Sequence, residues 1–324
     1  MKILVIKLGA LGDMVLASAA FTAIKRQFPK SDFSLLTTPA YFPIIKDCPY
    51  FRQYFLFDRE KPFRPQAQKI TAELRREKFQ LVINLQNNFK SNLLARLSGA
   101  PERIGFRKGL RLGLLTKNVV YDQQETALWN LNRVLALADI PAAKQPELYL
   151  TSKTETEAEN LLKSLGWKNE PLFGLHPGSS AGWQSKRWPV QHWVILARAI
   201  SKNGAIPVFF GDSSEFTELE EIAGNIQGKS FNLAGKTSLT ILPAVIKRCR
   251  TFISTDSGPL FIAAAAGIKT VGLYGPTESK RHAPPGVIIM EKKNLPCRPC
   301  YRKSCGQPLC LSNITPEDIL SVLR

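Results

Sequence analysis

An Asp-Ser-Gly-Pro turn at residues 256–259 stands between an apolar run, residues 251–254, and a helix-like segment of small residues, 260–266. A second apolar run, 269–274, ends at a Gly-Pro-Thr turn. The pattern predicts a strand–helix–strand unit with both loops at the carboxyl ends of parallel strands. A helix N-terminus in such a loop presents unpaired N–H groups, so the turn predicts a phosphate site. Its candidate binding residues are Asp256, Ser257 and Gly258.

Helix capping is the alternative explanation of this turn, because Asp and Ser are favoured N-cap residues. Two loops upstream favour ligand binding. The first, residues 176–186, combines glycine, hydroxyl groups and a lysine, as phosphate-binding loops do. Its candidate ligands are Ser179, Ser180 and Lys186. The second loop ends at Glu215, just beyond a predicted strand, 207–210, where an acid commonly holds ribose hydroxyls; a charge at a helix N-terminus is its alternative role.

A Gly-Ala-Leu-Gly-Asp turn at residues 9–13 follows a predicted strand, 2–8, and precedes a predicted helix, 14–28. Its two glycines let the backbone run close to a ligand, with Asp13 at the helix entrance. The helix dipole favours an ionised carboxylate there, which can act as a weak base. Its alternative role is an N-cap. The turn is not the G-x-G-x-x-G fingerprint, which argues against a nicotinamide enzyme.

The remaining pattern predicts an α/β protein of two domains. A chain of 324 residues exceeds the usual size of a single core. Residues 141–149 carry prolines and no periodicity, so they mark a break in the chain. We therefore expect domains at 1–145 and 146–324. A hydrophobic content of 44% with 22% charged residues is typical of a soluble globular protein.

The formal net charge of +18 implies an anionic partner: nucleic acid, an acidic membrane surface or a phosphorylated substrate. Residues 52–117 hold 15 Lys and Arg against 5 Asp and Glu, and a solvated basic face is the commonest meaning of such an excess. These positive charges are spread through loops, which favours an electropositive wall for a phosphorylated acceptor. The residues concerned include Arg59, Lys61, Arg64, Arg103, Arg107, Lys108 and Arg111.

The N-terminal stretch imitates a secretory signal, but Lys7 and Asp13 interrupt its apolar region. We therefore expect a cytoplasmic protein. No run approaches the roughly 18 uninterrupted apolar residues of a membrane-spanning helix. Association with a membrane would be peripheral.

The cysteines raise a separate question. Four of them form a C-x₂-C-x₄-C-x₄-C run near the C-terminus, and four close thiols can form a tetrahedral zinc site. The spacing is less regular than paired C-x₂-C motifs, so a structural zinc is considered but not favoured. The four are Cys297, Cys300, Cys305 and Cys310. His176, His192 and His282 show no ligand spacing, and His176, at a strand end, is expected to fix its loop.

Five motifs follow one another in a particular order. They are Lys-Leu-Gly-Ala-Leu-Gly-Asp at 7–13, Arg-Ile-Gly-Phe at 103–106, His-Pro-Gly-Ser-Ser with Lys-Arg-Trp-Pro at 176–189, Gly-Asp-Ser-Ser-Glu at 211–215, and Asp-Ser-Gly-Pro with Gly-Pro-Thr at 256–277. With these motifs the chain resembles the ADP-heptose lipopolysaccharide heptosyltransferases, glycosyltransferase family 9, over nearly its whole length.

The resemblance implies a GT-B fold, in which two Rossmann-like domains face each other across a cleft, with the acceptor on the first and the nucleotide sugar on the second. It implies that Asp13 is the general base and that the anomeric centre is inverted in one displacement. It further implies that Lys186 neutralises the donor diphosphate, that Ser179 and Ser180 touch it, and that Glu215 binds the ribose. The turn that places the diphosphate over a helix start corresponds to Asp256, Ser257 and Gly258. No metal is needed to stabilise departing ADP when a lysine and backbone N–H groups do so.

We therefore expect an inverting glycosyltransferase that adds heptose from ADP-heptose to Kdo or heptose in the inner core of lipopolysaccharide. The expected partners are an ADP-sugar donor and an anionic lipopolysaccharide precursor at the inner membrane, with no required cofactor, no nucleic acid and a monomeric chain. Phe261 stands where family members often carry histidine, so another nucleotide sugar or acceptor, or reduced activity, is an alternative. A basic nucleic-acid-binding protein is the alternative from another class, although aromatic-interleaved basic motifs are lacking. An oxidoreductase or epimerase is disfavoured by the missing dinucleotide fingerprint.

Overall fold

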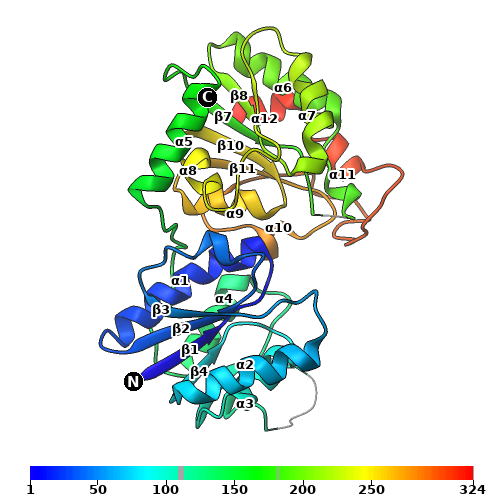
Figure 1. Cartoon of the computed structure of the whole chain (residues 1–324). Coiled ribbons are helices and arrows are strands. Elements are labelled where there is room, and N and C mark those ends of the chain that lie inside the picture. Colours follow the sequence, from blue (N-terminus) through cyan, green and yellow to red (C-terminus); the bar gives the residue numbers. More distant parts are fainter. Residues whose placement is uncertain (109–112, 181, 324) are drawn as a thin grey trace. The chain divides into compact units, whose positions relative to one another are not determined.

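A computed structural model describes residues 1–108, 113–180 and 182–323 of the chain (Figure 1). The chain divides into two compact units, Met1–Tyr149 and Leu150–Arg324. The division falls at the end of the proline-bearing stretch 141–149, where the expected domain boundary was 145/146. Each unit is described by itself below. Arg111, which we placed in the basic loops, lies outside the described residues.

Unit 1 is built on a parallel sheet with the strand order β3-β2-β1-β4-β5-β6. Its strands are β1 Lys2–Ile6, β2 Asp32–Thr37, β3 Phe51–Leu56, β4 Leu81–Asn84, β5 Glu102–Arg107 and β6 Lys117–Val120. Its helices are α1 Leu11–Gln27, the 3₁₀ helix η1 Phe42–Ile44, α2 Phe63–Glu77, α3 Phe89–Leu97 and α4 Ala127–Ala136. Helices α1 and α4 pack together, and α2 packs with α3, which gives a helical layer on each face of the sheet (Figure 1).

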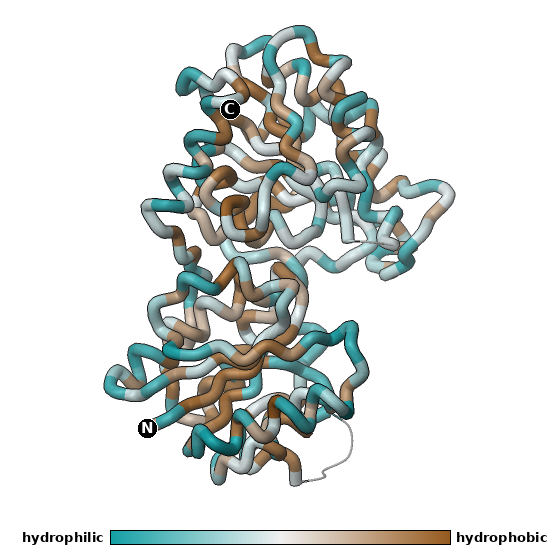
Figure 2. The backbone as a smooth tube through the Cα atoms, in the orientation of Figure 1, coloured by the Kyte–Doolittle hydropathy of each residue, from teal (hydrophilic) through white to brown (hydrophobic). Residues whose placement is uncertain are grey.

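The buried character of the strands explains this arrangement. In β1 the side chains of Ile3, Leu4, Val5 and Ile6 are at most 1% exposed, so the strand is covered on both faces. Apolar residues of α2 and α3 contact one face of the central strands. Figure 2 shows hydrophobic residues concentrated along the strands and hydrophilic ones on the outer turns of the helices.

Unit 2 repeats the plan with the order β12-β11-β10-β7-β8-β9, again all parallel. Its strands are β7 Leu172–His176, β8 Ile206–Phe209, β9 Phe231–Asn232, β10 Cys249–Thr255, β11 Lys269–Tyr274 and β12 Ile288–Glu291. Its helices are α5 Ser152–Ser164, η2 Gln184–Lys186, α6 Val190–Lys202, η3 Ser213–Glu215, α7 Phe216–Gly224, α8 Leu242–Lys247, α9 Gly258–Ala265, α10 Ser279–His282, α11 Leu309–Ser312 and α12 Pro316–Leu323. The core on one face of this sheet includes the fully buried Trp193 and Ile253.

The two sheets share one strand order. Counted from its own first strand, each reads 3-2-1-4-5-6, the order of the Rossmann fold. The order reverses between β1 and β4 in unit 1 and between β7 and β10 in unit 2. Loops that leave the carboxyl ends of strands on both sides of such a reversal diverge and leave room for a ligand. The predicted α/β class with two Rossmann-like domains is confirmed.

No helix in the described stretches of the chain combines the length and apolar character needed to cross a membrane.

Candidate functional site

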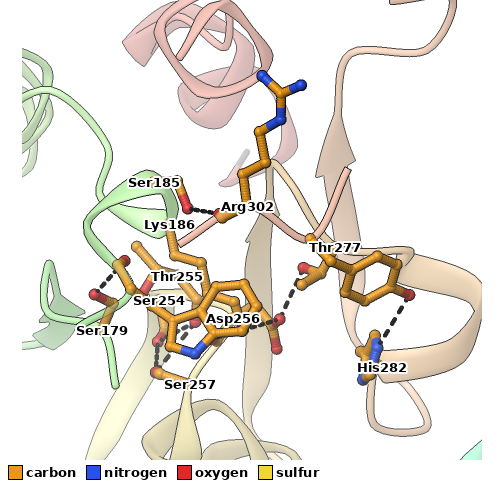
Figure 3. A network of polar contacts seen from close by, with 12 residues as sticks. Ser179, Ser185, Lys186, Ser254, Thr255, Asp256, Ser257, Thr277, His282 and Arg302 are labelled. Carbon is orange, nitrogen blue, oxygen red and sulfur yellow. Dashed lines mark hydrogen bonds and ion pairs between the residues drawn. The ribbon is translucent and has the colours of Figure 1, made fainter. Parts of the chain in front are cut away.

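The loops after β7, β10 and β11 meet in an ion pair at the reversal point of unit 2. The Lys186 ammonium lies 2.7 Å from Oδ2 of Asp256, and the Thr277 hydroxyl donates to the same oxygen at 2.8 Å (Figure 3). The lysine and aspartate side chains are only 12% and 9% exposed. The ammonium also lies 4.6 Å from the centre of the Trp183 ring. Two residues that the sequence placed in separate phosphate-binding loops are thus brought together.

The chain fixes this ion pair from its neighbours. Ser185, beside Lys186, is buried, and its hydroxyl donates to the carbonyl oxygen of Arg302 (Figure 3). Its backbone N–H donates to the carbonyl of Lys303 at 3.1 Å. An ammonium has three N–H donors, and among the described residues this one donates to two acceptors, Oδ2 and the carbonyl oxygen of Asp256. The pair therefore retains capacity to bind an anion.

Ser257 occupies the N-cap position of α9, but its side chain makes no capping hydrogen bond. Its hydroxyl instead lies 3.1 Å from Nδ1 of His176 and 3.0 Å from the hydroxyl of Ser254. The Asp256 carboxylate likewise contacts Lys186 and Thr277. Ser257 therefore stands at the cap position without forming the capping bond that the alternative explanation requires. The first N–H groups of α9, which begins at Gly258, donate to neither of these side chains.

His176 is the buried centre behind this turn. Its exposed fraction is 7%, and burial lowers its pKa to about 4, so the imidazole is neutral at physiological pH. A neutral imidazole can share a proton with the serine hydroxyls of Ser254 and Ser257 at no cost in buried charge. His176 thus holds the loop in place, as its position at the strand end predicts.

Glu215 lies on the other side of this loop. Its Oε2 accepts from the backbone N–H of Asp212 at 3.0 Å, and its Oε1 lies 3.1 Å from the Arg187 guanidinium. Burial raises the pKa of the Glu215 carboxyl, although these two partners act in the opposite direction. A methyl group added at Gly178 would stand 2.1 Å from Oε1, so any larger residue there would displace this carboxylate. Sequence reasoning missed Arg187, whose place in the Lys-Arg-Trp-Pro motif was the available signal.

Ser179 and Ser180 have different surroundings. The Ser179 hydroxyl donates to the carbonyl oxygen of Trp183 at 2.9 Å and so closes its own loop (Figure 3). Ser180 is exposed. Among the hydrogen bonds of the described residues, neither hydroxyl contacts Lys186. The two serine side chains would therefore turn toward a phosphate only once it is bound.

In unit 1, Asp13 lies in the first turn of α1 at the reversal point between β1 and β4. Ala10 is the N-cap residue, so the capping interpretation of Asp13 is wrong. The Asp13 side chain is 47% exposed, and its Oδ2 lies 3.8 Å from the ammonium of Lys7, which is only 7% exposed. A methyl group added at Gly9 would stand 2.9 Å from Oε1 of Gln86 and 3.0 Å from Oδ2 of Asp13. The glycine therefore lets the loop turn tightly beside an accessible carboxylate.

A cationic cavity adjoins this loop. Its volume is about 330 Å³, and its lining includes Leu8, just after β1, the basic residues Arg59, Lys61 and Lys90, and three phenylalanines. One of the Arg59 nitrogens donates to the carbonyl oxygen of Leu8 at 3.3 Å. The guanidinium of Arg103, in contrast, donates hydrogen bonds to the carbonyl oxygens of Ala100 and Leu114. The basic loops thus contain both ligand-accessible and structural positive charges.

The cysteine run does not form a metal-binding cluster. Within the described residues, no three His, Cys, Asp or Glu side chains gather closely enough to hold an ion. Cys310 is buried, and its sulfur lies against Gly275, whereas Cys297 and Cys305 are exposed. The zinc site considered from the spacing is therefore not found there, because packing holds the fourth thiol in the core.

The geometry defines a class of protein with two sheets, each of parallel strands in the Rossmann order. One sheet carries an accessible carboxylate at its reversal point and the other a buried lysine–aspartate pair. The family model described as "Glycosyltransferase family 9 (heptosyltransferase)" matches residues 67–310. The chain therefore belongs to glycosyltransferase family 9, and it is a glycosyltransferase.

Individual relatives agree with this assignment. Lipopolysaccharide heptosyltransferase 2 of Escherichia coli K12 is 29% identical over 86% of this chain and 83% of its own length. The solved structure of E. coli ADP-heptose lipopolysaccharide heptosyltransferase II has a TM-score of 0.83 at 25% identity, covering 100% and 97% of the two chains. A family 9 glycosyltransferase from Veillonella parvula has a TM-score of 0.90 at 22% identity, covering 99% and 96%. The likeness confirms the predicted GT-B fold.

Proposed function

We propose that the protein transfers heptose from ADP-heptose to Kdo or heptose in the inner core of lipopolysaccharide, with inversion at the anomeric carbon. The observation that carries the proposal is the Lys186–Asp256 pair beside the uncapped start of α9, a site for a diphosphate. The names of the heptosyltransferase relatives support the choice of sugar and acceptor.

The donor would bind to unit 2. Lys186 and the backbone at Gly258 would hold the diphosphate, with the hydroxyls of Ser179 and Ser180 completing its surroundings. Glu215 would accept hydrogen bonds from the ribose. Asp256 would position the lysine rather than touch phosphate, since a carboxylate repels an anion. Ser257 would position the turn, since its hydroxyl is bonded to His176 and Ser254. The site would thus bind the diphosphate of ADP, which becomes more negative as the bond to the sugar breaks.

The acceptor hydroxyl would be activated by Asp13. Its oxygen attacks the anomeric carbon as the bond to the ADP oxygen breaks, ADP leaves with the bonding electrons, and the proton passes to the Asp13 carboxylate. A single displacement of this kind inverts the anomeric centre. Every charge that develops is met by residues of the chain, so the proposal includes no cofactor.

The acceptor is expected to be anionic, because Arg59, Lys61 and Lys90 line the cavity beside the Asp13 loop. A protein working on such a lipid precursor would be a monomer in the cytoplasm that associates peripherally with the inner membrane. Raising the ionic strength should weaken acceptor binding, since salt screens exposed charges beyond about 10 Å at 0.1 M.

Ligand-induced stabilisation tests the proposal. ADP and ADP-heptose should raise the melting temperature, whereas single- and double-stranded oligonucleotides should not. Stabilisation by oligonucleotides alone would favour the nucleic-acid-binding alternative, which has only the net charge of +18 in its support. A mass-spectrometric screen of nucleotide sugars against lipid acceptors identifies the donor. Transfer of a sugar other than heptose would establish the alternative of a family member with a different donor.

A further inference from the structure

The segment from Arg298 to Lys303 forms an additional wall of the donor site, although the sequence suggested only a cysteine run there. The backbone N–H groups of Cys300 and Tyr301 both donate to the carbonyl oxygen of Pro276 at 3.0 Å. The guanidinium of Arg298 donates to the carbonyl oxygens of Gly275 at 2.6 Å and of Thr277 at 3.3 Å. The segment is therefore tied to the loop after β11.

The same segment is tied to the loop that carries Lys186. The Ser185 hydroxyl donates to the carbonyl oxygen of Arg302 (Figure 3). The Ser185 backbone N–H donates to the carbonyl oxygen of Lys303. Two loops that leave the sheet at β7 and β11, on either side of β10, thus share one brace. The exposed side chains of residues 298–303 therefore lie beside the Lys186–Asp256–Thr277 cluster.

Among the exposed and half-buried side chains of this region, Tyr301 and His282 lie against each other. The Tyr301 hydroxyl lies 3.3 Å from Nε2 of His282, and the two rings meet edge to face with centroids 5.8 Å apart (Figure 3). Tyr301 is 39% exposed, and its backbone φ of 52° falls in the left-handed region. A bulky residue rarely adopts that conformation and keeps it where its surroundings impose it.

The order of the strands gives this pair a place along a bound nucleotide sugar. Across the sheet, Glu215 follows β8, Lys186 follows β7, Asp256 follows β10, and Thr277 with His282 follows β11. Neighbouring strands are spaced by about 4.8 Å. A donor with its ribose at Glu215 and its diphosphate between β7 and β10 therefore extends its sugar toward the end of β11.

We propose that His282 and Tyr301 recognise the hydroxyl groups of the donor sugar. The inference rests on the proposed function and deepens it, because it assigns the sugar end of the donor to named side chains. An imidazole and a phenol can each donate or accept a hydrogen bond, which matches the capacity of sugar hydroxyls. A site that hydrogen-bonds a substrate hydroxyl discriminates strongly against analogues that lack it.

Separate measurements on ADP and ADP-heptose test this assignment. Tyr301→Phe removes only the hydroxyl, and His282→Asn removes the imidazole. In calorimetric titrations each variant should bind ADP as the wild type does, while ADP-heptose binds about tenfold more weakly. The loss in kcat/KM should be smaller for an ADP-sugar that lacks the exocyclic hydroxyls of heptose, because the wild type makes fewer contacts to it.

Two results would overturn the assignment. Equal weakening of ADP and ADP-heptose would show that the pair only supports the loops, and unchanged binding of both would show that it does not reach the sugar. Failure of the proposed function looks different, because then the wild-type protein itself would not bind ADP. The three outcomes are therefore separable in one series of titrations.

Discussion

The two sheets have the same strand order, but the carboxylates at their reversal points differ in exposure and in ion pairing. In unit 1, Asp13 is 47% exposed, and its one described ion-pair contact is Lys7 at 3.8 Å. In unit 2, Asp256 is nearly buried and bonded at 2.7–2.8 Å to both Lys186 and Thr277. The same topology therefore supports an accessible carboxylate in one unit and a compensated ion pair in the other.

The difference indicates that the Asp13 carboxylate is available for chemistry, whereas the Lys186–Asp256 pair also stabilises the fold. An exposed carboxylate with a single distant partner contributes little to folding and keeps its oxygens for chemistry. A buried pair depends on both its members, because removing one leaves an uncompensated charge. Substitution of Asp13 in unit 1 should therefore change turnover with little effect on stability. Substitution of Lys186 or Asp256 in unit 2 should change both turnover and stability.

Asp13→Asn should have the largest effect on turnover. The amide keeps the size of the side chain but cannot accept the proton, so kcat should fall about a thousandfold. Affinity for ADP-heptose should stay near its wild-type value. The melting temperature should fall only slightly, because the amide oxygen still faces the buried Lys7 ammonium, which also donates to the carbonyl oxygen of Leu85. Kinetics with a saturating lipid acceptor, together with donor titration and thermal melts, check all three. Unchanged turnover would remove Asp13 from the role of base, and a large loss of stability would break the contrast between the units.

Lys186→Met should show the opposite pattern. It leaves the Asp256 carboxylate buried without its counter-ion, which should cost about 3 kcal/mol of unfolding free energy and weaken ADP binding. Adding Asp256→Asn to the variant should recover part of that stability, since the two residues interact directly. Denaturant unfolding of both single variants and the double variant gives the coupling energy. Strict additivity would show that the ion pair does not couple the two loops.

The pH dependence of unfolding should also come from unit 2, which holds all three histidines of the chain. Because the folded pKa of His176 is about 4 and the unfolded value is near 6.5, the unfolded state binds more protons between these values. Stability should therefore fall as the pH drops below 6.5, by about 2 kcal/mol between pH 7 and pH 5.

Urea unfolding followed by tryptophan fluorescence measures this dependence. Trp129 is the one tryptophan of unit 1, so a Trp129→Phe background reports on unit 2. His176→Gln in that background should flatten the curve over the same pH range, although it lowers stability at pH 7. An identical slope in both proteins would assign the dependence to other groups.

Much of this site could be predicted from the sequence, because a glycine-marked turn after an apolar run depends on residues that are close together in the chain. The loops at residues 9–13, 176–186 and 256–259 all lie at carboxyl ends of strands, as predicted, and the strands and helices around them were predicted with small shifts in their bounds. The order of the family motifs added the identity of the fold. Local pattern and long-range arrangement agree wherever a loop follows directly from its own strand.

Contacts between distant segments could not be predicted in this way. Nothing near Ser185 in the sequence shows that it is held by Arg302, and nothing near Lys7 shows that its ammonium is buried beside Asp13. The spacing of the cysteines suggested zinc, yet Cys310 packs against Gly275. Capping was the alternative role considered for Asp13 from its neighbours alone, and the structure places Ala10 at the cap. These outcomes depend on tertiary packing, which overrides local preference.

Gly178→Ala should give the smallest effect and the finest test of how tightly the unit 2 site is packed. Its Cβ would meet both carboxylate oxygens of Glu215, so this side chain must shift away from Arg187. We expect a loss of about 1 kcal/mol in unfolding free energy and a measurable weakening of ADP binding. Gly224→Ala is the matched control, because Gly224 ends α7 and its added Cβ would meet no described atom within 4 Å beyond its chain neighbours and its own helix backbone. That control should be neutral or slightly stabilising, since alanine favours helix over glycine by up to about 1 kcal/mol. If the two variants bind ADP equally well, the position of the Glu215 carboxylate does not matter to the nucleotide, and the close packing of the unit 2 loops serves folding alone.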